Sequence, residues 1–129
     1  MTLYIIRHGE TEFNKKSIVQ GSGVDSDLNE TGLEQARAFF ETYQDIDFEL
    51  VVTSKLRRTH QTVRHFLDRD IPWIEQEDIN EISWGAHEGL PATPERTAQY
   101  NDMIDNWKKG NLHASLPEGE TAAQLLERV

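Results

Sequence analysis

The chain has 129 residues, of which 36% are hydrophobic and three are tryptophan, a composition typical of one globular domain and too aromatic for a disordered segment. Its 13 basic and 23 acidic residues give a formal charge of −10, which argues against a broad nucleic-acid or membrane surface because such surfaces are basic. The absence of cysteine rules out a disulfide framework, a thiolate nucleophile and a cysteine-type zinc site.

No segment has the roughly 18 apolar residues of a membrane span. The first ten residues also lack the basic leader and apolar segment of a signal peptide. We therefore expect a cytoplasmic protein with a single domain over residues 1–129.

The first half of the chain alternates apolar runs with amphipathic segments. Leu3–Ile6 is a continuous apolar run, which predicts a strand covered on both faces in a parallel sheet. Residues 29–44 have helical spacing of their apolar side chains, residues 48–54 form a second apolar run, and residues 55–69 return to helical spacing. The order strand, helix, strand, helix predicts an α/β domain with a parallel sheet and right-handed crossovers.

The second half continues with a third strand and two helices. Residues 71–76 read as a strand, and Pro72 favours its start or an edge position. Residues 93–110 read as a helix that is capped by Thr93 and stopped by a glycine. A further helix begins within residues 121–129.

Cationic and polar residues follow two of the predicted strands. Arg7 and His8 follow the first strand, and Ser54, Arg57 and Arg58 follow the second. In parallel sheets, ligands bind beyond the carboxyl ends of the strands. A neutral imidazole is a competent nucleophile towards phosphorus, and neighbouring guanidinium groups bind a phosphate dianion and lower the imidazole pKa by like-charge repulsion. This pattern predicts phosphoryl chemistry.

Four segments together resemble the successive signatures of the histidine phosphatase superfamily, the phosphoglycerate mutase-like proteins. They are LYIIRHGETEFN (residues 3–14), TSKLRRTHQT (53–62), INEISWGAHEGL (79–90) and PEGET (117–121). The resemblance implies a three-layer α/β sandwich with a mainly parallel central sheet and helices on both faces. It also implies metal-independent phosphoryl transfer through a phosphohistidine, with no cofactor.

The resemblance assigns roles to individual residues. His8 would be the phosphorylated nucleophile, and Glu81 would be the acid/base carboxylate. The expected phosphate contacts are Arg7, Asn14, Gln20, Gly21 and Arg58. Arg58 aligns with the family arginine that serves catalysis, so we interpret Arg57 as surface charge.

The sequence departs from the family pattern in one respect. The family has a second histidine, followed by glycine, at the end of a strand beyond the PEGET region, and no such pair precedes Val129. We therefore interpret the domain as incomplete at its C-terminus. His113 is a poor substitute because it falls in a loop that the family varies around its substrate.

The leading interpretation is a phosphomonoesterase that hydrolyses a small phosphorylated metabolite. The segment between the Glu81 motif and PEGET is shorter than the insertion of the cofactor-dependent mutases, which favours hydrolysis. The alternatives are a non-catalytic phospho-ligand-binding or scaffold protein that lacks the second histidine, and a phosphoglycerate mutase-type phosphotransferase. The expected partner is a small phosphorylated substrate and neither nucleic acid nor a membrane, and a homodimer is compatible with the sequence.

Overall fold

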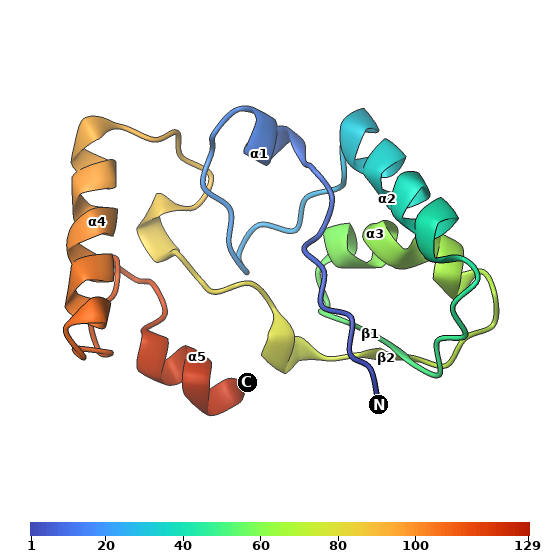
Figure 1. The fold of residues 1–129 in the computed structure, drawn as a ribbon. Coiled ribbons are helices and arrows are strands. Elements are labelled where there is room, and N and C mark those ends of the chain that lie inside the picture. Colours follow the sequence, from blue (N-terminus) through green and yellow to red (C-terminus); the bar gives the residue numbers. More distant parts are fainter. The chain divides into compact units, whose positions relative to one another are not determined.

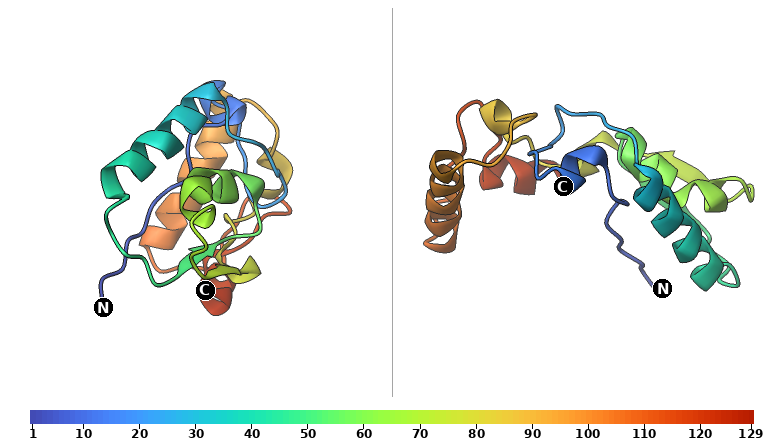
Figure 2. Two further views of the ribbon diagram at one scale, coloured as in Figure 1. Left: turned by 90° about the vertical axis from the view of Figure 1, so that its right-hand side faces the viewer. Right: turned by 90° about the horizontal axis from the view of Figure 1, so that it is seen from above.

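The structure, a computed structural model, describes residues 1–129 and divides them into two compact units (Figures 1 and 2). The first unit consists of Met1–Glu12 and Ser26–Glu77, and the second consists of Phe13–Asp25 and Asp78–Val129. None of the helices combines the length and the apolar character that crossing a bilayer would require.

The first unit contains two helices and a small parallel sheet. Its elements are α2 (Glu30–Tyr43), β1 (Val51–Thr53), α3 (Arg57–Leu67) and β2 (Trp73–Glu75). The strands β1 and β2 pair in parallel and are joined through α3, and α3 packs against both β1 and α2. The predicted alternation of helices with parallel strands is thus confirmed for residues 29–76.

Helices cover only one face of this sheet. Trp73 and Glu75 of β2 lie on the face that meets α3, where the Trp73 ring is 5.1 Å from the ring of His60. Val52 and Ile74 pair in register on the opposite face, and each is 49% exposed. Within the first unit no helix lies on that face, so the expected cover by helices on both faces is not found in this unit.

The predicted strand at Leu3–Ile6 is not formed in this structure. No ladder of hydrogen bonds joins it to β1 or β2, and Leu3 and Ile5 are 73% and 85% exposed. The Tyr4 ring packs 5.9 Å from that of Tyr43 and 5.3 Å from that of Phe48. A strand is stabilised by main-chain hydrogen bonds to a neighbouring strand. Within residues 1–129 this apolar run has no such neighbour, and most of its side chains are exposed.

An aromatic cluster forms the core of the first unit. Phe66 of α3 is 2% exposed, and the rings of Phe39, Phe40 and Phe48 lie 5.0–5.5 Å from its ring in edge-on orientations. The predicted apolar face of α2 therefore packs on α3, as the helical spacing indicated. Leu33, also placed on that face by its spacing, is 52% exposed instead.

The second unit is built from helices and loops. Its helical elements are η2 (Gly85–His87), α4 (Pro94–Lys108) and α5 (Ala122–Arg128), while α1 (Glu12–Lys15) and η1 (Glu77–Ile79) begin at its boundaries. The predicted start of α4 is confirmed, since the Thr93 side chain accepts a hydrogen bond from the main-chain nitrogen of Arg96. A reciprocal capping box between Thr121 and Gln124 starts α5.

Candidate active site

The predicted site residues are distributed over both units. Arg7, His8 and Arg58 belong to the first unit, and Asn14, Gln20, Gly21 and Glu81 belong to the second.

The ring of His8 is oriented by its own main chain. Nδ1 lies 2.7 Å from the carbonyl oxygen of Gly9. Because a carbonyl only accepts hydrogen bonds, Nδ1 carries the proton, and the lone pair of a neutral ring is on Nε2. His8 therefore has the tautomer in which Nε2 can act as a nucleophile.

The loop after His8 is tied to the first turn of α3. The main-chain nitrogen of Gly9 donates to Oγ1 of Thr62 at 2.9 Å, and the same hydroxyl donates to the carbonyl oxygen of Arg58 at 2.7 Å. Both hydrogen bonds are buried. The structure thus brings the His8 loop to the turn that carries Arg58, as the strand ends predicted, and it does so through Thr62, which the sequence did not indicate.

The two neighbouring arginines of α3 differ sharply in environment. Arg58 is 0% exposed, which is rare for arginine unless its guanidinium group is paired. The Arg57 side chain is 56% exposed, and its Nη1 lies 3.3 Å from a carboxylate oxygen of Asp27. Of the two arginines, only Arg58 has a buried charge, and that burial calls for a specific function.

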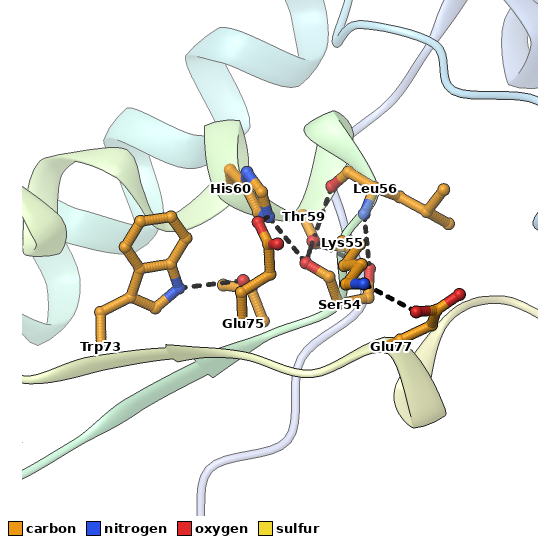
Figure 3. A network of polar contacts seen from close by, with 9 residues as sticks. Ser54, Lys55, Leu56, Thr59, His60, Trp73, Glu75 and Glu77 are labelled. Atoms are coloured by element: carbon orange, nitrogen blue, oxygen red, sulfur yellow. Dashed lines mark hydrogen bonds and ion pairs between the residues drawn. The ribbon is translucent and has the colours of Figure 1, made fainter. Parts of the chain in front are cut away.

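A network of polar contacts holds the start of α3 at the carboxyl end of β1 (Figure 3). The main-chain nitrogen of Leu56 donates to Oγ of Ser54 at 3.2 Å, and the Thr59 hydroxyl donates to the Leu56 carbonyl at 2.8 Å. Nε2 of His60 donates to the Ser54 carbonyl at 2.7 Å and lies 3.1 Å from Oε2 of Glu75. These contacts satisfy polar groups at the helix start and fix the direction of its first turn.

The N-terminus of α2 packs directly on the loop that follows His8. A Cβ atom on Gly32 would lie 2.1 Å from the carbonyl oxygen of Glu10, and one on Gly9 would lie 2.8 Å from the carbonyl oxygen of Gly32. Asn29 caps α2 through a 2.9 Å bond from the Gly32 nitrogen, and its Nδ2 donates to Glu10 Oε1 at 2.8 Å. A glycine in the first turn of a helix was the sequence signal for this close approach.

Arg7 is exposed in this structure. The sequence predicts Arg7 at the end of a buried strand, and its exposure follows from the absence of that strand. Its predicted contact with phosphate remains a prediction.

In the second unit, three predicted residues lie in adjoining segments. Glu81 is half-buried, and the carbonyl oxygen of the next residue, Ile82, accepts a hydrogen bond from the Ser22 nitrogen at 3.2 Å. A Cβ atom on Gly21 would lie 2.4 Å from that same carbonyl oxygen. The loop of Gln20 and Gly21 therefore lies against the main chain beside Glu81.

A second carboxylate, missed by the sequence analysis, lies against the same loop. Cβ atoms on Gly21 and Gly23 would lie 2.3 and 2.4 Å from the two carboxylate oxygens of Glu88. Oε1 of Glu88 also accepts a hydrogen bond from the Trp84 nitrogen at 2.8 Å. The paired glycines therefore allow the carboxylate to contact the loop.

The main chain on both sides of Glu81 is held by the last helix. Arg128 of α5 donates through Nη2 to the carbonyl oxygen of Asn80 at 3.0 Å, and Glu120 accepts from the Ser83 nitrogen at 3.2 Å. The hydrogen bond from Arg128 holds the pKa of the Glu120 carboxyl below its ordinary value and raises the pKa of Arg128. Glu120 of the PEGET motif and Arg128 of α5 therefore hold the main chain on the two sides of Glu81.

Comparison with known proteins identifies a family match over almost the whole chain. The family described as the histidine phosphatase superfamily (branch 1) matches residues 3–129. The chain is 38% identical over 131 residues to fructose-2,6-bisphosphatase TIGAR of Bos taurus, covering 98% of this chain and 47% of that protein. It is 32% identical over 133 residues to a 2,3-bisphosphoglycerate-dependent phosphoglycerate mutase of Parvibaculum lavamentivorans, covering 98% of this chain and 62% of that one.

A solved structure has a similar fold. The α-ribazole phosphatase of Shigella flexneri matches with a TM-score of 0.78 and 29% sequence identity, covering 95% of this chain and 60% of that one. The chain thus spans about half to two-thirds of the length of these proteins.

Proposed function

Because the chain belongs to the histidine phosphatase superfamily (branch 1), we propose that it hydrolyses the phosphate ester of a small metabolite through a phosphohistidine on His8. The hydrogen bond from His8 Nδ1 to the Gly9 carbonyl carries this proposal. In the neutral ring, this bond leaves on Nε2 the lone pair needed to attack phosphorus.

The reaction has two steps. Nε2 of His8 attacks phosphorus, the N–P bond forms as the ester P–O bond breaks, and Glu81 in its acid form donates its proton to the departing alkoxide. A water molecule then attacks the phosphohistidine and gives its proton to Glu81, and the N–P bond breaks to release inorganic phosphate.

The remaining predicted residues would bind the phosphoryl oxygens. They are Arg7, Asn14, Gln20, Gly21 and Arg58. Guanidinium and amide donors stabilise the charge that develops on the equatorial oxygens, which is the main task in phosphoryl transfer. The burial of Arg58 and the close approach of the Gly21 loop to the chain beside Glu81 support these assignments.

The names of the relatives support a small organic phosphate as substrate. A fructose-2,6-bisphosphatase and an α-ribazole phosphatase are both similar to this chain. We also propose that residues 1–129 form part of a single three-layer domain, in which a further layer covers the sheet face of Val52 and Ile74. The 49% exposure of both side chains and the 60% coverage of the solved phosphatase support this.

Phosphotransfer is a second candidate function, which the similarity to a phosphoglycerate mutase favours. The two candidates share the phosphohistidine and differ in its fate. Hydrolysis gives inorganic phosphate, whereas a mutase returns the phosphoryl group to a second hydroxyl of the substrate. Measurement of free phosphate against rephosphorylated product separates the two.

The proposal is tested with p-nitrophenyl phosphate hydrolysis and with gels run at neutral to alkaline pH, which preserve the acid-labile N–P bond of phosphohistidine. His8→Ala should lower hydrolysis by about 1000-fold or more, because the nucleophile is lost. His113→Ala, in an exposed loop, is the matched control and should retain the parent's rate. Equal hydrolysis by the parent and His8→Ala would refute the proposal, and a parent that binds phosphate without turnover would indicate the non-catalytic alternative.

A further inference from the structure

Two side chains from different helices bind the peptide groups on either side of Gly9. Oγ1 of Thr62, from α3, accepts a hydrogen bond from the Gly9 nitrogen at 2.9 Å. Oε1 of Gln35, from α2, accepts one from the Glu10 nitrogen at 2.8 Å. Consecutive N–H groups of the chain are thus held by separate elements.

The hydrogen bond between Glu10 and Gln35 involves the same peptide group that accepts from the His8 ring. The Glu10 N–H belongs to the same peptide group as the Gly9 carbonyl, and that carbonyl accepts from His8 Nδ1 at 2.7 Å. Because a peptide group is planar, fixing the direction of its N–H also fixes the direction of its carbonyl. Gln35 therefore orients the group that determines the His8 tautomer.

The contact of Thr62 connects the same turn to Arg58. A hydroxyl has one proton to donate and lone pairs to accept, and Thr62 uses both functions. It accepts from the Gly9 nitrogen at 2.9 Å and donates to the Arg58 carbonyl at 2.7 Å, while the residue is 6% exposed. A continuous chain of groups therefore runs from the His8 ring through Gly9 and Thr62 to the main chain of Arg58.

We propose that Thr62 and Gln35 are positioning residues for the nucleophile. They hold the two peptide groups of Gly9 so that its carbonyl binds Nδ1 of His8 and leaves Nε2 as the reactive nitrogen. The consequence for turnover rests on the proposed function of His8, whereas the consequence for the ring tautomer does not.

Because Gln35 is exposed, its replacement can distinguish a positioning role from a general effect on stability. Thr62 is buried, so its loss also affects folding, but Gln35 is exposed and its replacement should cost little stability. A purely structural role predicts that the effect on the His8 ring follows the loss of stability. A positioning role predicts that replacing Gln35 changes the tautomer of the His8 ring with almost no loss of stability.

The variants Thr62→Val and Gln35→Met remove the polar contacts at nearly constant volume, and Thr62→Ser and Gln35→Glu restore an acceptor oxygen. Thr42→Val is the matched control, because the Thr42 hydroxyl makes the same bond to a carbonyl four residues earlier, Ala38, in α2. Thermal unfolding first establishes that each variant is folded.

The first measurement is the ¹⁵N NMR spectrum of the His8 ring at a pH where the ring is neutral. The parent, Thr62→Ser and Thr42→Val should show a protonated Nδ1 and an unprotonated Nε2. Thr62→Val and Gln35→Met should shift towards the tautomer with the proton on Nε2. Unchanged ring signals in both folded variants would overturn the proposal.

The second measurement is the steady-state kinetics of p-nitrophenyl phosphate hydrolysis. In Thr62→Val, kcat should fall by about 10- to 100-fold with little change in KM, since a misplacement of about 1 Å can cost about 100-fold. Thr62→Ser should restore most of kcat. If the parent forms no phosphohistidine but the ring signals still shift in the variants, the proposed function fails and the positioning role stands.

Discussion

Arg128 and Glu120 form a two-point ion pair, with Nε 2.6 Å from Oε1 and Nη2 3.0 Å from Oε2. The side chains are only 23% and 15% exposed, so solvent screens the pair weakly. The guanidinium group also binds the main-chain carbonyls of Asp78 and Asn80. One arginine near the end of the chain therefore holds the segment before Glu81.

Replacement of Arg128 should destabilise the second unit. Arg128→Ala removes the guanidinium donor from two main-chain carbonyl groups and from the Glu120 carboxylate, which keeps only its hydrogen bond from the Ser83 nitrogen. We therefore expect a loss of about 1–3 kcal/mol in the free energy of unfolding. Urea unfolding monitored by the fluorescence of Trp84 and Trp107 measures it. Arg37→Ala is a suitable control, because its pair with Glu41 is exposed on both sides; an equal loss in both variants would contradict the prediction.

The same pair should make stability depend on acid pH. The pKa of the Glu120 carboxyl is lowered in the folded state by its hydrogen bond to Arg128, so the unfolded state binds more protons as the pH falls. The stability from the pair is therefore complete above the ordinary pKa near 4.5 and is lost as the pH falls through the folded-state pKa. Urea unfolding between pH 7 and pH 3 should show a flatter acid limb for Glu120→Gln than for the parent.

The control for this pH experiment is Glu77→Gln. The pKa of Glu77 is also lowered, by its hydrogen bond to Lys55, but both side chains are at least half exposed. An exposed pair contributes little to stability, so the acid limb should stay as in the parent. A Glu120→Gln profile that parallels that of the parent would contradict the prediction.

Gly32→Ala should be destabilising, although alanine is normally the better helix residue. Its Cβ would lie 2.1 Å from the carbonyl oxygen of Glu10, and a main-chain oxygen cannot move aside as a flexible side chain can. We expect a loss of about 1–3 kcal/mol in the free energy of unfolding, measured by urea denaturation. Thr31→Ala, one residue earlier and exposed, should change stability little. A stabilised Gly32→Ala variant would show that α2 does not pack on the His8 loop.

Arg57 and Arg58 provide a matched pair of variants that tests the proposed phosphate site. Arg58→Lys keeps the charge but loses the planar fork, and its kcat/KM for p-nitrophenyl phosphate should fall by about 100-fold. Arg57→Lys, exposed beside Asp27, should retain the parent's kcat/KM. Circular dichroism checks that Arg58→Lys is folded, since the parent side chain is 0% exposed. Equal kinetics in the two variants would remove Arg58 from the site.

Removal of metal ions should leave the hydrolysis rate unchanged. The proposed donors to the phosphoryl group are guanidinium and amide groups, which need no bridging cation. Dialysis against EDTA, followed by assay with p-nitrophenyl phosphate in metal-free buffer, measures the effect. A loss of activity that Mg²⁺ or Zn²⁺ restores would contradict the proposed mechanism.

Local signals in the sequence were sufficient to place α2, α3, α4 and α5, but not the short helices α1, η1 and η2. The Asn29 cap starts α2, the Thr93 cap starts α4, and Thr121 with Gln124 starts α5, each through contacts within four residues. The parallel pairing of β1 with β2 also followed from the order of the elements. The four motifs taken together, of which the one around His8 is the first, also indicated the family.

Long-range contacts were not predictable in the same way. The bonds of Gly9 to Thr62, of Glu10 to Gln35 and of Arg128 to Asn80 join residues 25 to 53 positions apart, and no local pattern encodes them. The prediction of a strand at residues 3–6 was wrong for a related reason. Its apolar pattern is typical of a strand paired and buried within a sheet, and within residues 1–129 this segment is neither paired nor buried.

The order of residues along this chain thus determined where its longer helices begin, which apolar runs favour strands and which imidazole we propose for phosphoryl chemistry. Only the tertiary structure decided which apolar run is paired, which arginine is buried and which side chains orient that imidazole. The physical reason is that capping and periodicity act over one or two turns, whereas pairing, burial and the aim of a peptide group depend on atoms brought together by folding.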